Sequence, residues 1–203
     1  MKEIFKQKQK KTILDTLETF VIAFAVCAFI YITIAIPNKV EGQSMEPNFE
    51  HKDLVITNKT IQYLGETDFG RSQNYDYKRG DVVIVRQSNI DIIKRIVALE
   101  GESIEIKNNS LYVEGQELNE KYLPITTRTK LPNKDESLLQ NGTTLEVPDH
   151  SYFVLGDNRE NSKDSRYRDV GFVDRDEIKG KVVFRYWPLT KFGIIHSGEY
   201  SLE

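Results

Sequence analysis

The longest apolar run of the chain lies near its N-terminus. Residues 19–36 contain no charged side chain. At 1.5 Å per residue, a helix of this length spans about 27 Å, close to the thickness of a bilayer's hydrocarbon core. Asp15 and Glu18 precede the run and fit either acids favoured near a helix N-terminus or a paired acid site inside the membrane. The pattern predicts a single transmembrane anchor over residues 13–36.

Basic residues are concentrated on one side of this run. Those that precede it are Lys2, Lys6, Lys8, Lys10 and Lys11. Because positive flanks stay in the cytoplasm, we expect residues 1–12 to form a basic cytoplasmic tail. Residues 37–203 would then be the extracytoplasmic part of a single-pass protein of the cell membrane. A cleaved signal peptide is the alternative, but its apolar core is about 7–15 residues long, which is shorter than this run.

After residue 37 the apolar positions fall into short β-branched or aromatic runs separated by turn residues, which is typical of strands. These runs cover residues 54–57, 81–86, 90–99, 103–107, 110–113, 143–147, 151–155 and 179–187. Asn108 and Asn109 separate two of them and predict a hairpin, because asparagine tolerates positive φ in a two-residue turn. No amphipathic helix of ordinary length is expected after residue 40.

The predicted fold is therefore mostly β: an N-terminal transmembrane helix followed by an antiparallel β-rich domain with a small β-hairpin insertion. Residues 119–142 are polar, lack a periodic pattern and contain two prolines. We expect them to form an exposed loop within a smaller subdomain at about residues 105–150.

Composition excludes several classes of protein. The net charge of −3 is too small to indicate a nucleic-acid partner. Cys27 is the only cysteine and lies inside the apolar run, so no intrachain disulfide can form and we interpret the thiol as a small apolar group. The histidines are isolated and no metal-ligand spacing occurs, so no metal or cofactor is predicted. Residues 65–72 imitate a phosphate-binding loop, but Arg71 stands where lysine belongs.

Ser44 follows the apolar run by about eight residues, which keeps it near the membrane surface. It lies in the segment Gly42-Gln43-Ser44-Met45-Glu46-Pro47. This segment begins like the nucleophile elbow of α/β-hydrolases but lacks the second glycine. Taken alone, Ser44 is equally well explained as a loop serine before a proline turn.

Lys94 breaks an apolar pattern. In an extended strand it shares one face with Ile92 and Ile96, two residues away on either side. Desolvation there favours the neutral amine. An ordinary lysine is neutral in only about 1 molecule in 2,500 at pH 7, so a pKa lowered by two to three units would make Lys94 a competent base. The alternative is a lysine whose ammonium group reaches water along its own stem.

Residues 156–166 follow an apolar strand and are rich in hydroxyl, carboxylate and guanidinium groups. They are interpreted either as a solvated loop or as a hydrogen-bonded support for a site at the end of that strand.

Together these segments resemble the type I signal peptidases, the membrane-bound Ser/Lys proteases of the S26 family that remove signal peptides. The segments that match family motifs are Ser44-Met45-x-Pro47, Arg79-Gly80-Asp81-Val82-Val83, Lys94-Arg95-Ile96-Val97, Gly101-Glu102, residues 156–166, Gly180-Lys181-Val182 and Arg185-Tyr186-Trp187-Pro188. A lysine rather than a histidine at the position of the base indicates the bacterial or organellar branch.

The resemblance implies that Ser44 is the nucleophile and Lys94 its general base. The backbone N–H groups of Ser44 and Gly42 would stabilise the oxyanion, since Gly42 stands where some members use a serine hydroxyl. The residues that match supporting and orienting positions are Ser162, Asp164, Arg166 and Arg95, with Asp164 and Arg166 as an ion pair. The residues implied to line shallow pockets for small side chains, as in an Ala-x-Ala end, are Val40, Met45, Phe49, Ile92 and Ile93.

The implied function is a membrane-anchored serine endopeptidase that needs no cofactor. Its partners would be exported preproteins with signal peptides and membrane lipid, close to the secretion translocon and without nucleic acid. One alternative is a dedicated Ser/Lys peptidase that matures a single pilin-, conjugation- or coat-type protein. The other is a non-catalytic anchored β-domain that binds a partner. Self-cleaving repressors share the dyad but carry a DNA-binding domain and no membrane span.

Overall fold

The computed structural model describes residues 2–65, 67–73, 75–88 and 90–202, which fall into two compact units, Met1–Ile36 and Pro37–Glu203. The first unit is the helix α1, Lys2–Thr33. Its stretch Lys11–Tyr31 is long and apolar enough to cross a membrane, and none of it is buried in protein. The predicted apolar helix is thus present, and the same helix also covers residues 2–10, which precede the apolar stretch.

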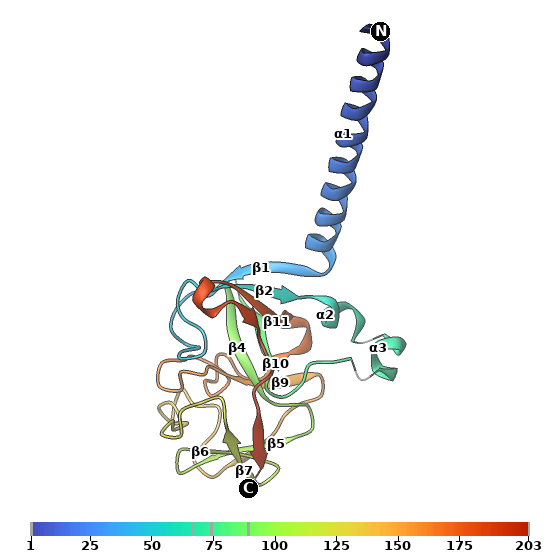
Figure 1. The fold of residues 1–203 in the computed structure, drawn as a ribbon. Helices are drawn as coiled ribbons and strands as arrows, with labels where there is room; N and C mark the ends of the chain where they lie inside the picture. Colours follow the sequence, from blue (N-terminus) through green and yellow to red (C-terminus); the bar gives the residue numbers. More distant parts are fainter. Residues whose placement is uncertain (1, 66, 74, 89, 203) are drawn as a thin grey trace. The chain divides into compact units, whose positions relative to one another are not determined.

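The second unit contains two antiparallel sheets within its described residues (Figure 1). In the larger sheet the order is β1 (Ala35–Lys39), β2 (Leu54–Asn58), β11 (Ile178–Trp187), β3 (Val82–Gln87), β4 (Ile90–Ala98), β9 (Ser151–Leu155) and β10 (Val173–Asp174), with β12 (Gly193–Ile194) paired to β11. In the smaller sheet the order is β13 (Tyr200–Leu202), β7 (Gln116–Glu120), β6 (Ser110–Val113), β5 (Ser103–Lys107) and β8 (Thr144–Glu146). The mostly β fold predicted from the sequence is confirmed.

The predicted strands agree with the observed ones to within one residue at each end. Asn108 and Asn109 have φ values of 52° and 64°, as the hairpin between β5 and β6 requires. The helices described after residue 40 are short: α2 (Thr60–Leu64), α3 (Asp68–Ser72) and the 3-10 turns η1 (Arg175–Glu177) and η2 (Leu189–Lys191). The strands that the sequence pattern missed, β1, β7, β10, β12 and β13, are short or lack apolar alternation.

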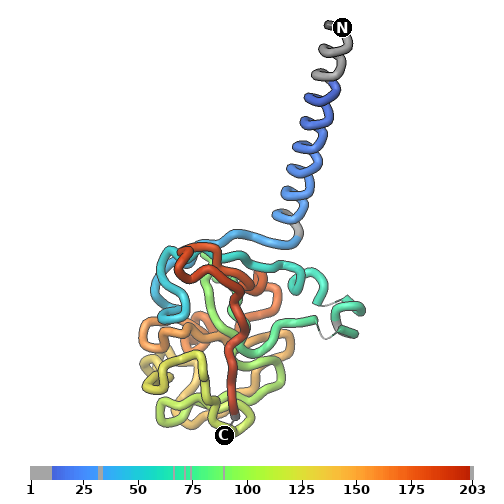
Figure 2. The backbone as a smooth tube through the Cα atoms, viewed as in Figure 1, coloured from blue at the N-terminus to red at the C-terminus, as the bar shows by residue number. Residues whose placement is uncertain are grey.

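Among the described residues of the second unit, three apolar clusters hold the fold together. One lies between the sheets and joins β4 and β9 to the smaller sheet; Phe153 and Ile104 are examples of its fully buried members. A second packs on one face of the larger sheet around Ile96 and Val154. The third attaches the loop 40–53 to the larger sheet, since Met45 and Phe49 pack with Ile93. In Figure 2 this light-blue loop lies beside the orange segment that follows β9, in agreement with their hydrogen bonds.

The segment 119–142 was expected to be an exposed loop, and that prediction is wrong in part. Thr129, Ser137 and Leu139 are buried, with Leu139 only 1% exposed. The backbone N–H of Leu138 donates to the carbonyl of Arg166, at 2.7 Å. An irregular backbone buries side chains without a regular spacing, so this packing left no periodic signal in the sequence.

We predict that Leu139→Ala lowers the free energy of unfolding by about 2–5 kcal/mol, because it removes a buried side chain and leaves a cavity. The same change at Leu189, which is 69% exposed, should alter that free energy by less than about 0.5 kcal/mol. Denaturant unfolding of the full-length protein in detergent, followed by circular dichroism, gives both values. Equal effects would contradict the packing of this segment.

Candidate active site

Ser44 lies in a turn whose neighbours are anchored in the core. Met45 and Phe49 are each 1% exposed, and the N–H of Phe49 donates to the carbonyl of Met45 at 2.9 Å. The side chain of Ser44 itself is half-buried. Apolar packing of Met45 and Phe49 in the core therefore fixes the turn, while the half-buried Ser44 remains accessible to a substrate.

Lys94 projects from the middle of β4 onto this serine. Its Nζ atom donates to Ser44 Oγ at 3.0 Å. Lys94 is only 3% exposed. It is buried even though β9, the strand on one side of β4, pairs only with residues from Arg95 onward. The two residues are 50 positions apart in the sequence, so their contact depends on the attachment of the loop 40–53 to the sheet.

Burial is the main influence on the proton affinity of this amine, and it lowers the pKa of Lys94 to about 8. Of the nearby charges, Asp164 raises that pKa and Arg166 lowers it. Asp157 raises it by less. At a pKa of about 8, roughly one lysine in ten is neutral at pH 7, which is sufficient for a general base.

The segment after β9 holds the turn that contains Ser44 in place. The N–H of Asn158 donates to the carbonyl of Ser44 at 3.0 Å, and its side-chain amide donates to the carbonyl of Gln43 at 3.1 Å. Gly156 permits this approach, since a Cβ there would lie 2.4 Å from Ser44 O and 2.2 Å from Ser162 Oγ. The sequence pattern indicated the polar segment that contains Asn158, but it did not single out this residue.

Asp164 and Arg166 form the ion pair that the resemblance implied. Two guanidinium nitrogens of Arg166 donate to the two carboxylate oxygens of Asp164, at 2.8 and 3.0 Å. The remaining guanidinium hydrogens reach the carbonyls of Lys130, Arg159 and Ser162. Asp164 also accepts the N–H of Gly156 at 3.0 Å. This bidentate pair thereby fixes the segment 156–166 around the site.

Ser162 was implied to orient Lys94 through a hydrogen bond. Its side chain is buried beside Gly156, at 7% exposure. Its hydroxyl has no hydrogen-bond partner among the residues that the structure describes. Ser162 therefore lies in the wall of the site without a direct bond to the lysine.

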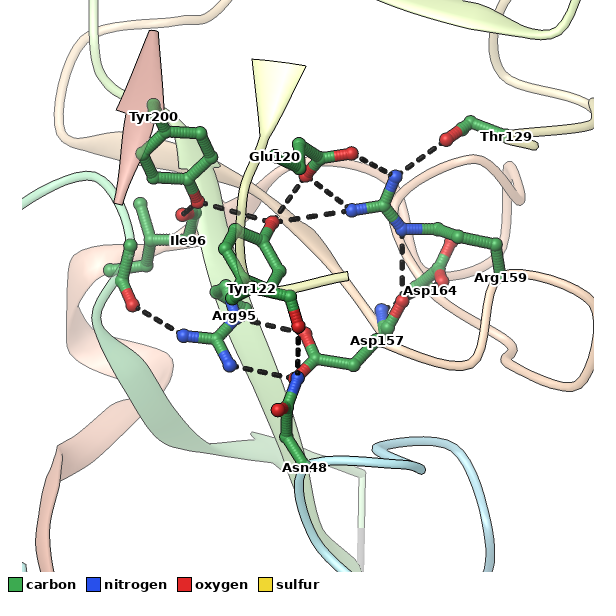
Figure 3. Close-up of polar contacts among 12 residues, drawn as sticks. Asn48, Arg95, Ile96, Glu120, Tyr122, Thr129, Asp157, Arg159, Asp164 and Tyr200 are labelled. Atoms are coloured by element: carbon green, nitrogen blue, oxygen red, sulfur yellow. Dashed lines mark hydrogen bonds and ion pairs between the residues drawn. The ribbon is translucent and has the colours of Figure 1, made fainter. Parts of the chain in front are cut away.

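Arg95 follows Lys94 and enters a buried polar network (Figure 3). Its guanidinium donates to both carboxylate oxygens of Asp157 at 2.8 and 2.7 Å, and it stacks on the ring of Tyr122 at 4.1 Å. Asp157 also accepts the side-chain amide of Asn48 at 2.9 Å. This carboxylate thus ties β4 to the loop that contains Ser44, through a residue, Asn48, that the sequence pattern did not single out.

The same network continues into the smaller sheet. Arg159 makes an ion pair with Glu120 at the end of β7 and donates to Thr129. Figure 3 shows the hydroxyl of Tyr122 lying between this pair and Tyr200 of β13. Both sheets therefore contribute to the position of the segment after β9.

The implied pocket residues separate into two groups. Val40 and Ile93 line a small hollow of about 30 Å³. The other residues that line it are Val55 and Ile84, which are apolar, and Asn38, Lys39, Glu41 and Asp91, which are polar or charged. The other implied residues, Met45, Phe49 and Ile92, are not among those that line it. Met45 and Phe49 instead pack with Val40 and Ile93 in the core, and Ile92 packs with the cluster around Ile96.

Gly42, the second implied oxyanion donor, has a φ of +86°, in the left-handed region that favours glycine. Its N–H donates to Nδ1 of His51 at 3.1 Å. By contrast, the N–H of Ser44 makes no hydrogen bond with the described residues. His51 lies nine residues beyond Gly42, and nothing in the sequence pattern pointed to this contact.

One edge of β4 is open beside the dyad. β3 pairs with residues 90–95 on one side, whereas β9 pairs only with residues 95–98 on the other. Within the described part of the chain, residues 90–94 therefore have no strand on the side away from β3. Alternate residues of such an edge direct their N–H and C=O groups outward, where an extended peptide can pair with them.

Comparison with known proteins gives a consistent result. The model of the family "Signal peptidase, peptidase S26" matches residues 13–187. The chain is 33% identical to signal peptidase I S of Bacillus subtilis (strain 168), over 90% of this chain and 94% of that protein. It is 32% identical to signal peptidase IB of Staphylococcus aureus (strain COL), over 90% and 94%. A crystal structure of a signal peptidase I from Enterococcus faecalis V583 aligns at 33% identity and a TM-score of 0.42, covering 52% of this chain and 96% of that one.

The lowered pKa of Lys94 predicts the pH dependence of peptide cleavage. Only the neutral amine can accept the proton of Ser44, so kcat/KM should rise about tenfold per pH unit below 8 and level off above it. Initial rates on a fluorogenic peptide between pH 6 and 10.5 measure this profile. A rise that continues to pH 10 would contradict a desolvated lysine as the base.

Proposed function

The chain belongs to the signal peptidase family, peptidase S26, and on that premise we propose that Ser44 and Lys94 are its nucleophile and general base. The activity is that of signal peptidase I, a serine endopeptidase whose substrates are preproteins with signal peptides. The observation that supports the assignment of the two residues is the 3.0 Å hydrogen bond from a buried lysine to a reachable serine.

The proposed reaction begins with the neutral amine of Lys94. It accepts the proton of Ser44, whose Oγ attacks the carbonyl carbon of the scissile bond. The oxyanion of the tetrahedral intermediate accepts the unengaged N–H of Ser44. Lys94 then donates the proton to the leaving amine. In deacylation, water loses a proton to Lys94 and attacks the acyl carbonyl, and Lys94 returns that proton to Ser44 Oγ as the acyl group leaves.

The open edge of β4 supports a binding mode for the substrate. A peptide that pairs with residues 90–94 is held in extended form, and it reaches Lys94 at the point where β9 closes the edge. The scissile bond would therefore be placed at the dyad by backbone hydrogen bonds that do not depend on sequence. Side-chain selection must come from the adjacent hollows.

The hollow beside Val40 and Ile93 supports selection for small residues. Its cavity volume of about 30 Å³ is small, and its apolar wall is formed by Val40, Val55, Ile84 and Ile93. A methyl group is the side chain that such a space accommodates best. This agrees with cleavage after an Ala-x-Ala type sequence.

We propose that residues 37–203 lie outside the cytoplasm. Lysines precede the apolar stretch of α1, and positive flanks are retained on the cytoplasmic side. Ser44 follows Ile36 by eight residues, so an extended chain places it no more than about 28 Å from the end of the anchor. Anchoring near the surface raises its effective concentration for substrates that are themselves held in the bilayer.

Substitution of either dyad residue tests the assignment. Ser44→Ala and Lys94→Ala should each lower kcat on a preprotein with an Ala-x-Ala site by about 10³-fold or more, because each removes one half of the same proton transfer. For the same reason, the double variant should be no slower than the single ones. Mass spectrometry of the new N-terminus identifies the cleaved bond. A double variant that is slower than either single variant by the product of both losses would contradict a shared role.

Labelling in intact cells tests the orientation. In a Cys27→Ser background, a cysteine at Ile125, which is 96% exposed, should react with a membrane-impermeant maleimide added from outside. A cysteine at Lys11 should react only after permeabilisation. The reverse labelling pattern would place the β-rich unit in the cytoplasm.

A further inference from the structure

The residues just before the nucleophile are exposed, and only a few contacts hold them. Glu41, Gly42 and Gln43 are all exposed. On one side of them, Val40 is fixed by backbone hydrogen bonds with Lys52 and Asp53, both at 2.8 Å. On the other side, Asn158 holds the carbonyls of Gln43 and Ser44.

Gly42 lies between these two attachments and is the most adaptable residue of the segment. Beyond its two chain neighbours, no atom lies within 4 Å of the position that a Cβ would occupy, so no packing of distant residues restrains it. Glycine loses more backbone freedom on ordering than any other residue. Its φ of +86° sets the direction in which the chain enters Ser44, so a rotation there would move the N–H and Oγ of the nucleophile.

His51 accepts the hydrogen bond that holds the backbone amide of Gly42. The N–H of Gly42 donates to Nδ1 of this histidine at 3.1 Å. This bond uses the lone pair of Nδ1, which faces the N–H of Gly42. His51 is well placed to be a fixed acceptor, because the next two residues are bound to Val40 and Asp53 is buried in an ion pair with Arg185.

We propose that His51 is a positioning residue for catalysis: its Nδ1 atom holds the amide of Gly42 and thereby orients Ser44 toward Lys94 and toward the bound peptide. This role rests on the proposed function of Ser44. His51 itself touches neither the substrate nor the proton that is transferred. It acts through the backbone of Gly42, whose amide is engaged and not directed at the oxyanion.

The role implies an effect on kcat with little effect on KM. Peptide pairing with β4 does not involve His51, so ground-state binding should be unchanged. A misdirected nucleophile lowers the rate of attack, and misplacement by about 1 Å can cost a hundredfold. Loss of the hydrogen bond between Gly42 and the exposed His51 should therefore reduce kcat by about tenfold.

The test compares four full-length proteins in detergent: the parent, His51→Leu, His51→Asn and the control His196→Leu. Asparagine places an acceptor oxygen near the position of Nδ1, whereas leucine removes the acceptor. His196 is also an exposed histidine, but it lies between β12 and β13 and outside the loop 40–53 that contains Ser44. Initial rates on one preprotein peptide give kcat and KM, and melting temperatures report whether all four proteins are folded.

The expected result is a tenfold lower kcat for His51→Leu with unchanged KM and melting temperature. His51→Asn should recover kcat to within about threefold of the parent, and His196→Leu should match the parent. Equal kcat for the parent and His51→Leu, or equal losses for the leucine and asparagine variants, would overturn the role of His51 alone. Absence of cleavage by the parent would overturn the proposed function and this role with it.

Discussion

The site depends on keeping one lysine out of water. Burial that lowers the pKa of Lys94 to about 8 corresponds to roughly 3–4 kcal/mol against the charged amine, because each pKa unit is worth about 1.4 kcal/mol. A lysine with a lowered pKa destabilises the folded protein below that pKa, and this cost is lost as the pH rises through 8 toward the unfolded value. Because the free energy of unfolding of a protein is only about 5–15 kcal/mol, the packing around Lys94 must be strong enough to offset this cost.

The ion pairs around the site act on this lysine in the direction opposite to burial. Asp164 and Asp157 each favour the charged amine. Both carboxylates are bound bidentately by arginines, Arg166 and Arg95, so neither is left as an isolated negative charge beside Lys94. Arg166 also lowers the pKa of Lys94 directly. On balance these pairs still favour the charged amine, because Asp164 outweighs Arg166, so burial is the influence that keeps the pKa of Lys94 low.

Strand alternation in the sequence was sufficient to place the main strands and to identify Lys94 as a lysine on an apolar face. The residues that complete the site were less predictable, because they act through the backbone. Asn158 holds a carbonyl, His51 accepts an amide, and Gly156 is required only because Ser44 and Ser162 approach it closely. Such contacts depend on how segments that are distant in the chain come together, so they produce no regular spacing of residue types in the sequence. The packing of Leu139 was missed for a similar reason, since its segment is irregular.

An open sheet edge is normally a risk, because it offers unpaired backbone groups to other chains. In this protein the open part of β4 is confined to residues 90–94, since β9 covers the strand from residue 95 onward. A short edge cannot pair over a long distance, yet it is long enough to hold a peptide next to Ser44. The residue at which β9 begins to pair with β4 therefore determines both the length of the open edge and the place where it ends. It restricts unwanted association, and it ends the open edge at Lys94, the residue proposed to accept the proton of Ser44.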